Sequence, residues 1–367
     1  MAAGIIAAPA FSAERIAVHI EGELQQWGVL ANQDVDTGDG TGVDTNRLDQ
    51  KHNSELYFNG ETILDNGLEI GLSVTLEANT DANQIDQSYL YVEHPHYGLL
   101  QMGDVDNAPV NMAITAPDGG VSANDGDLVG IEAFILPEGF EATNTLIDTT
   151  ILQLGDDTSG KFNYYTPRVS GFQLGLSYVP QFEDGGDNNN SISRTGNDGP
   201  VNDGIAIGLS FSEEFGDLGV EAFGGYLFGD TPASEGSDNV NGAGAGLVLA
   251  VAGFEAGGSF AWADGDTPGG NSIDGHAFDV GVAYETGPYR VGLTYIKGIT
   301  EGSRADSSDQ RLDQVVISGT YALGPGVDLV GGLFYFDADG EKNQVAGTNG
   351  IESTDGFGAL SGLKLTF

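Results

Sequence analysis

Charged side chains alternate with apolar ones between positions 47 and 58. The apolar residues Leu48, Leu56 and Phe58 share one parity, and the other parity carries Arg47, Asp49, Lys51, Asn53, Glu55 and Tyr57. In an extended strand, alternate residues lie on opposite faces. Arg47 and Lys51 therefore share one polar face, where fixed charges could orient dipolar solutes and sort ions by charge. The simpler alternative is that both bases are only solvated, or paired with Asp49 and Glu55.

Aspartates cluster in several glycine-rich segments, and their oxygen ligands would suit Ca²⁺. Asp34, Asp36 and Asp39 form the clearest group. They do not match the EF-hand pattern, because Gly38 takes its fifth position and Thr45 its twelfth. A structural calcium ion at these aspartates is one hypothesis, and a simply solvated acidic loop is the other. We expect that no cofactor is required.

No motif in the sequence supports catalysis. There is no cysteine, and neither a P-loop nor a nucleophile elbow is present. His94 and His96 have the spacing of a metal pair, but they flank Pro95 in a predicted turn without a third ligand nearby. The sequence therefore predicts that the protein is not an enzyme.

The composition is strongly acidic, with 12 Lys and Arg against 55 Asp and Glu and a net charge of -43. A nucleic-acid partner is excluded, because phosphate neutralisation needs a basic face. The acidity indicates either solubility in a saline setting or a field that attracts cations. Glycine provides 58 of 367 residues, which disfavours helices.

Period-two alternation recurs along the chain and predicts an all-β fold. It is clear at 16–24, 68–78, 172–178, 205–211 and 278–284. Seven short connections alternate with eight mostly longer ones rich in Asp, Asn, Gly and Ser, which together join sixteen strands. Short turns on one rim and long loops on the other, with an even strand number, are typical of an antiparallel transmembrane β-barrel. We find no domain linker.

The two ends of the sequence have their own patterns. Residues 1–12 resemble the tail of a secretory signal without its basic start, so we expect one domain over 13–367. The last residues, 357–367, alternate again, with Leu363, Leu365 and Phe367 on one parity. A strand that ends on an exposed aromatic residue resembles the assembly signal of Gram-negative outer-membrane barrels.

Two further segments carry a family resemblance. The run from Tyr164 through Thr166-Pro167-Arg168 to Tyr178 is similar to the "Y-x-S-P-x-x-x-G-F…Y" segment of Gram-negative general diffusion porins. The run from Tyr97 to Asn107 resembles the strand before their third loop. With Trp27 and an early Ala-Glu, the chain looks most like the alphaproteobacterial trimeric porins.

The resemblance implies a sixteen-stranded barrel in the outer membrane, with an infolded third loop at about 104–157. It implies a homotrimer, with outer-membrane lipid, lipopolysaccharide and the barrel assembly machinery as partners. Leu136 to Phe140 is similar to a third-loop segment of some members, which places Glu138 at the constriction. From the same resemblance we expect acids and bases to face one another across the pore: Glu138, Glu132 and Asp127 opposite Arg47, Lys51, Arg15 and Lys161.

We therefore expect a water-filled channel that passes ions and small hydrophilic solutes passively and favours cations moderately. Small outward residues near Ala243 and Ala245 suit packing between subunits. The alternative function is that of a secreted soluble β-sheet protein that binds its target through calcium. It would need neither an aromatic belt nor Phe367, and the RTX-type repeats that would support it are absent.

Overall fold

The computed structural model describes residues 15–37, 43–78, 84–121, 123–124, 127–130, 133–137, 140, 146–153, 159–181, 201–231, 238–265, 274–301, 309–340 and 350–367. Within these ranges the chain forms sixteen strands in one closed barrel, each paired antiparallel with its sequence neighbours, as the alternation predicted. No helix in the described part of the chain is long and apolar enough to cross a membrane. The predicted signal segment 1–12 lies outside the described residues.

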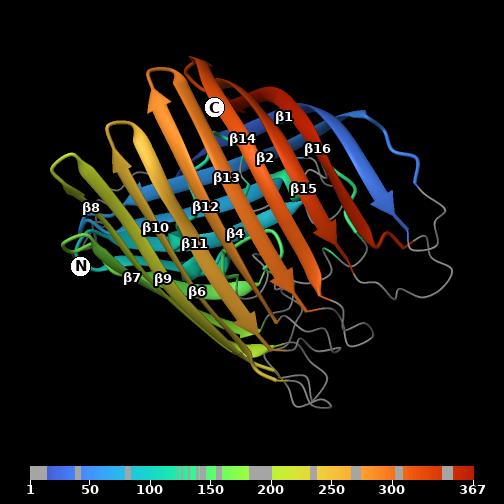
Figure 1. Ribbon diagram of the computed structural model, residues 1–367. Helices are drawn as coiled ribbons and strands as arrows, with labels where there is room; N and C mark the ends of the chain where they lie inside the picture. Colours follow the sequence, from blue (N-terminus) through green and yellow to red (C-terminus); the bar gives the residue numbers. More distant parts are fainter. Residues whose placement is uncertain are drawn as a thin grey trace, which may run out of the picture.

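The strands follow one another around the barrel (Figure 1). Their bounds are β1 Ala17–Asp36, β2 Leu48–Ile63, β3 Glu69–Glu77, β4 Ile85–His94, β5 Gly98–Asp104, β6 Gly160–Tyr165, β7 Phe172–Gln181, β8 Asn202–Phe215, β9 Leu218–Asp230, β10 Val240–Val251, β11 Phe254–Asp264, β12 Gly275–Thr286, β13 Tyr289–Thr300, β14 Gln310–Gly324, β15 Val327–Asp339 and β16 Ser353–Thr366. Two short helices, α1 Ala108–Met112 and α2 Asp127–Gly130, lie in the connection between β5 and β6. This connection, 105–159, is called the third loop below.

The tight turns gather at one end of the barrel, the short-turn rim (Figure 1). Between β10 and β11, Ala252 and Gly253 have φ of 50° and 83°, the positive values that a two-residue turn needs to match the twist of its strands. Gly216 has φ of 69° between β8 and β9. The tight turns therefore set the register between consecutive strands.

The outward face of the barrel is apolar and carries rows of aromatic side chains. Close to the short-turn rim, the rings of Phe254 and Tyr284 lie 4.3 Å apart and those of Tyr289 and Tyr321 4.8 Å apart. Aromatic residues in such rows mark the level where a membrane meets water. This arrangement accounts for the mean hydropathy of the sequence, which is only -0.13, because every outward residue alternates with a residue that faces the lumen.

Strands β1 and β16 close the barrel over a register that runs from Glu23 opposite Thr366 to Asp36 opposite Ser353. Beyond it, the backbone N–H of Gly22 donates to the carbonyl of Phe367 (2.9 Å), and the N–H of Phe367 donates to the carbonyl of Gly22 (3.1 Å). The last residue of the sequence is therefore part of the closing seam.

Ending the chain at Thr366 should lower the yield of folded barrel, because it removes both hydrogen bonds to Gly22 at the seam. The measurement is the fraction of heat-modifiable, protease-resistant protein in outer membranes. Phe357→Ala is the matched control, since it removes an exposed outward ring from the same strand and leaves the seam intact. Equal yields for the truncated and the full chain would contradict the prediction.

Candidate functional site: the lumen and its third loop

The third loop enters the lumen and is fixed to the wall from its first turn. The N–H of Ala108 donates to Ser177 Oγ on β7 (2.7 Å), and Asn163 Nδ2 on β6 donates to the carbonyl of Asp106 (2.7 Å). The side chain of Asn107 caps α1 by accepting from the N–H of Val110. Helix α1 is thereby held against β6 and β7.

Asp279 on β12 is the central polar anchor of this loop. Its carboxylate accepts from the N–H of Ala116 (2.9 Å), from Asn124 Nδ2 (2.6 Å) and from Ser259 Oγ (2.7 Å). The residue is buried, with 1% of its surface exposed. A buried charge is expensive unless hydrogen bonds satisfy it. The loop supplies two of these donors, so loop position and burial of the carboxylate depend on each other.

A second group of anchors follows along β13 and β14. Thr294 Oγ1 donates to the carbonyl of Pro117 (3.0 Å), and Arg290 Nε donates to that of Asp118 (2.7 Å). The N–H of Gly119 donates to Ser318 Oγ (3.0 Å). Burial is the main influence on the carboxyl of Asp118 and raises its pKa, although the N–H of Gly120 and Arg290 oppose the shift. Because the protonated form of this carboxyl is favoured on the wall, falling pH should strengthen, not weaken, docking at this point.

Glycines on the lumenal face let the loop backbone lie directly on the wall. A Cβ added to Gly281 would overlap the carbonyl oxygen of Pro117, and one added to Gly246 would overlap that of Ile114. Gly292 and Gly298 meet the backbone of the loop in the same way. The glycine content of the sequence thus has a specific use here, since these positions form a groove for the third loop.

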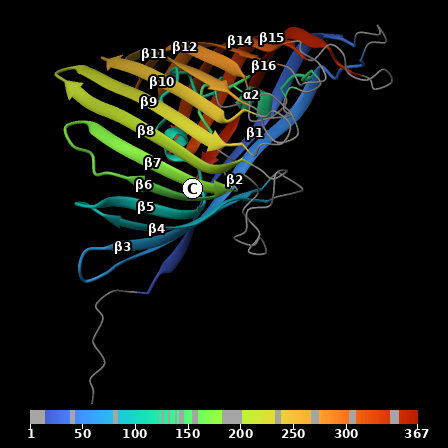
Figure 2. The same ribbon diagram turned by 90° about the horizontal axis from the view of Figure 1, so that it is seen from below.

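The loop also brings an apolar core into the lumen. Phe134 stacks on Phe336 of β15 with ring centroids 3.8 Å apart, and both belong to a buried cluster that includes Trp27 of β1. Leu146 and Leu152 join a second cluster against β7 to β12. The loop therefore covers the inner wall from β6 around to β1, and the wall of β2 to β4 faces it across the lumen (Figure 2).

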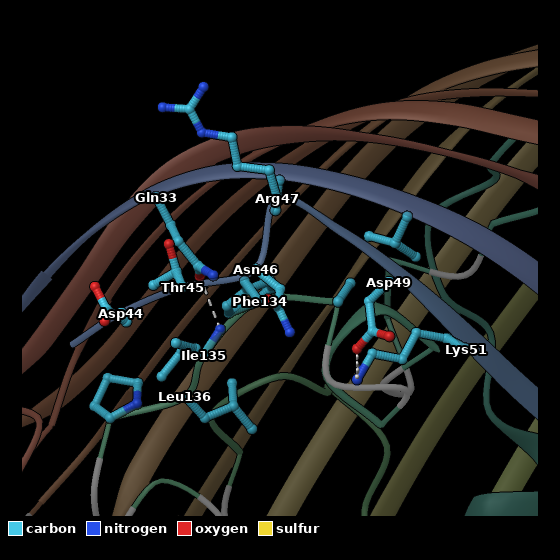
Figure 3. A pocket seen from close by; sticks show the side chains of 14 residues that line it. Gln33, Asp44, Thr45, Asn46, Arg47, Asp49, Lys51, Phe134, Ile135 and Leu136 are labelled. Atoms are coloured by element: carbon cyan, nitrogen blue, oxygen red, sulfur yellow. Dashed lines mark hydrogen bonds and ion pairs between the residues drawn. The ribbon is translucent and has the colours of Figure 1, made fainter.

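A cavity of about 700 Å³ separates the loop segment Ala133–Pro137 from β1 and β2 (Figure 3). The N–H of Ile135 donates to Gln33 Oε1 on β1 (2.9 Å), which ties the loop to the opposite side of this cavity. Lys51 lies on the β2 side, and its ammonium is 3.3 Å from Asp49 Oδ2. The structure thus brings Lys51 close to the segment that leads into position 138.

Of the other predicted bases, Arg47 also lines this cavity, but the end of its side chain is directed away from Ile135 and Leu136 (Figure 3). The remaining two bases lie elsewhere. Arg15 is exposed just before β1, near the short-turn rim. Lys161 is buried, and its ammonium donates to the carbonyl of Ser159 (2.9 Å). Neither Arg15 nor Lys161 lines the cavity beside Lys51.

The three predicted acids of the third loop cannot be placed in the same detail. Glu132 and Glu138 lie outside the described residues, and Asp127 is described only as the first residue of α2. Their roles at the constriction remain predictions.

The calcium hypothesis also remains a prediction. Asp34 and Asp36 belong to β1, although an acidic loop was expected there, and Asp39 lies outside the described residues. In the part of the chain that the structure describes, no three carboxylate or imidazole side chains are grouped to hold a metal ion.

The lumenal face of β1 to β4 carries a row of glutamates that the sequence analysis did not single out as candidate site residues. They fall on the lumenal parity of their strands: Glu21 and Glu23 on β1, Glu55 and Glu61 on β2, Glu69 and Glu77 on β3, and Glu93 on β4. The alternation in the sequence could have identified these glutamates, because each lies next to an outward apolar residue. Tyr91 donates to Glu61 (3.2 Å) and to Glu69 (3.0 Å), so the carboxylates are held on the wall.

Several lumenal bases, in contrast, are neutralised locally. Lys364 lies 2.6 Å from Glu23, and Arg290 lies 2.6 Å from Glu255 and 3.2 Å from Glu285. With the pair of Lys51 and Asp49, these contacts leave the described lumen with an excess of negative charge along β1 to β4.

Replacing Asp279 with Ala should loosen the third loop, because Ala116 and Asn124 lose their common acceptor inside the barrel. We expect frequent current fluctuations in single-channel recordings and faster proteolysis within 105–153, while the barrel remains folded. Asp328→Asn on β15 is the control, since it removes a carboxylate that is not an anchor of the loop. Steady currents from the Asp279→Ala protein would show that this anchor is dispensable.

Comparisons with known proteins agree with this architecture. A family model described as Gram-negative porin matches residues 1–341, and no match was found among curated protein sequences. Among solved structures, the outer membrane channel DcaP of Acinetobacter baumannii aligns with a TM-score of 0.62 and 14% identity, over 96% of this chain and 97% of that one. An anion-selective porin from Comamonas acidovorans aligns with a TM-score of 0.58 and 15% identity, over 96% and 100%. OmpT of Vibrio cholerae, in a trimer form, aligns with a TM-score of 0.60 and 14% identity, over 96% of this chain and 100% of that one.

These comparisons give no support to a secreted calcium-dependent binding protein. The family match covers most of the chain, and the closed barrel has the lumen, the infolded loop and the apolar outer face that a channel needs. The chain belongs to the Gram-negative porin family, and it forms an outer-membrane diffusion channel.

Proposed function

We propose that this channel favours cations moderately and passes small hydrophilic solutes without a tight binding step. The observation that carries the proposal is the row of glutamates on the lumenal face of β1 to β4, opposite the third loop. Three of them, Glu23, Glu55 and Glu77, are direct cross-strand neighbours. Like charges directly opposite one another destabilise a sheet, and a cation that passes along this wall would offset their repulsion. We also propose that no catalytic activity accompanies transport, because no catalytic motif is present in the sequence.

The constriction is proposed to lie at the cavity between Lys51 and the segment Ala133–Pro137. Glu138 directly follows this segment, which supports its predicted role opposite Lys51. The negative field would be short-ranged, because salt screens charges over about 8 Å at physiological ionic strength. Cation preference should therefore weaken as salt rises.

Glu55→Gln combined with Glu69→Gln should lower the cation-to-anion permeability ratio by roughly a factor of two in dilute KCl. The measurement is the reversal potential across a planar bilayer in a salt gradient. Asp34→Asn with Asp355→Asn is the charge-matched control, because these two residues pair across β1 and β16 on the outward face. Anion preference in the unmodified protein, or equal shifts in both double variants, would refute the proposal.

We propose further that the protein is a homotrimer and that subunits meet through the outer face of β1 to β6. The wall is low on this side, since β5 has 7 residues and β6 has 6, against 14 for β8. At about 3.3 Å per residue and a tilt near 45°, β5 covers only about 16 Å of an apolar band of roughly 25 Å. Such a wall needs a protein neighbour in place of lipid.

Polar side chains halfway along β1 and β2 also support a subunit interface on this face. Gln50 Nε2 donates to Gln26 Oε1 (2.6 Å) on the outward side of β1 and β2, and His52 lies opposite Gln26. Polar groups are costly in hydrocarbon unless they find partners. The outward face of β10, with Ala243 and Ala245, is instead flanked by aromatic residues of β9 and β11, Tyr226, Phe260 and Trp262. As the interface between subunits, the outer face of β1 to β6 is therefore favoured over the face near Ala243 that the sequence suggested.

Single cysteines test this arrangement cleanly, because the chain has none of its own. Leu100→Cys on β5 should give covalent dimers with a flexible bis-maleimide, and Ala245→Cys on β10 should not. Native mass in mild detergent should correspond to three protomers. Cross-linking from Ala245→Cys alone, or the mass of one protomer, would contradict the proposal.

A further inference from the structure

A cavity lies under the start of the third loop, close to the short-turn rim. Its smaller part, about 240 Å³, is lined by Arg168, Ser210 and Met112, among others. Its larger part, about 770 Å³, reaches Glu214 and Glu255. Both parts share the lining residues Ile114, Ser212 and Glu221, so they adjoin one another, and together they are called the lower cavity below.

Arg168 provides a fixed positive charge at one end of the lower cavity. Its Nη1 donates to the carbonyl of Gly171 (2.6 Å), and its Nη2 donates to Gln173 Oε1 (3.1 Å) and Ser210 Oγ (3.1 Å). All these acceptors are neutral, and no carboxylate among the described residues lies within ion-pair distance of this guanidinium. This differs from Lys51, Arg290 and Lys364, which are paired with acids. The guanidinium is thus held in place without an acidic partner among the residues that the structure describes.

Carboxylates without partners lie further along the same cavity. Glu221 and Glu214 are exposed, and neither has a hydrogen-bond or ion-pair partner among the described residues. On β8, Ser212 pairs with Glu221, two residues from the Ser210 that binds Arg168. Two residues of a strand extend roughly 7 Å. The positive and negative groups are therefore separated by several bond lengths, and Met112 and Ile114 offer an apolar surface nearby.

We propose that the lower cavity is a binding place for zwitterionic solutes whose carboxylate and ammonium groups are several bonds apart, such as ω-amino acids and short peptides. The carboxylate would bind Arg168, the ammonium would bind Glu221 or Glu214, and the alkyl part would contact Ile114. The proposal rests on the channel function above, because the solute enters the cavity through the lumen. It adds a solute class to a channel that otherwise separates solutes by size and charge.

The test uses single-channel recordings with 6-aminohexanoate as the probe, in which a chain of five methylene groups separates the carboxylate from the ammonium. We expect brief, concentration-dependent current interruptions. Hexanoate and hexylamine each carry only one of the charges, and glycine holds both charges close together, so all three should interrupt the current much less.

Glu221→Gln should weaken the apparent affinity for the probe about tenfold, equivalent to about 1.4 kcal/mol, without disturbing the fold, because this carboxylate is exposed and unpaired. Arg168→Gln should have a similar effect, and Arg168→Lys, which keeps the charge, should restore part of it. Asp328→Asn is the matched control, since it removes a lumenal carboxylate near the same rim on β15 and should leave the affinity unchanged.

The proposal is overturned if hexylamine or hexanoate interrupts the current as often as 6-aminohexanoate does. It is also overturned if Glu221→Gln and Arg168→Gln both leave the affinity unchanged. Normal conductance without any interruption would remove the binding place alone, whereas absence of conductance would count against the channel function itself.

Discussion

Satisfaction of backbone hydrogen bonds in a membrane is the constraint on which this structure depends. Hydrocarbon offers no partners to N–H and C=O groups, so a sheet that spans it must close on itself. Here closure is completed by β1 and β16. Once every strand has two neighbours, side chains have only two directions to take, outward to the membrane or inward to the lumen. The alternation in the sequence follows from these two directions, and the even strand number follows from the closure of an antiparallel sheet.

The lumen, in contrast, has no such uniform rule, because the third loop divides it. From β6 around to β1, lumenal side chains are covered by the loop, and small or apolar residues such as Gly281, Phe336 and Ala338 are found there. Across the lumen, from β2 to β4, lumenal residues remain charged. Lumenal residues are thus small or apolar where the third loop covers the wall, and charged on the wall that the loop does not cover.

This division explains how far the sequence could predict the structure. Strand number, the outward faces and the position of the third loop depend on local alternation and connection length, and these predictions were confirmed. Lys161 shows the limit. It was expected at the pore constriction, but its side chain is buried and its ammonium donates to the carbonyl of Ser159, and no local pattern in the sequence marks such burial. Asp279 could not be identified at all, because its partners Ala116 and Asn124 are distant in the sequence and nothing local marks an anchor. Arg47 was expected at the constriction because the alternation of β2 was extended to the residue before the strand, but the end of its side chain is directed away from the third-loop segment (Figure 3).

The anchors of the third loop have a consequence for the order of folding. Gly119 binds Ser318, 199 positions later in the chain, and Ala116 binds Asp279, 163 positions later. Contacts between such distant segments form slowly, because the intervening chain must first be ordered. The groove on β10 to β13 exists only after those strands have paired. The third loop precedes these strands in the sequence and is therefore synthesised before them. It must remain undocked until the second half of the barrel has folded, so the lumen is narrowed late in assembly.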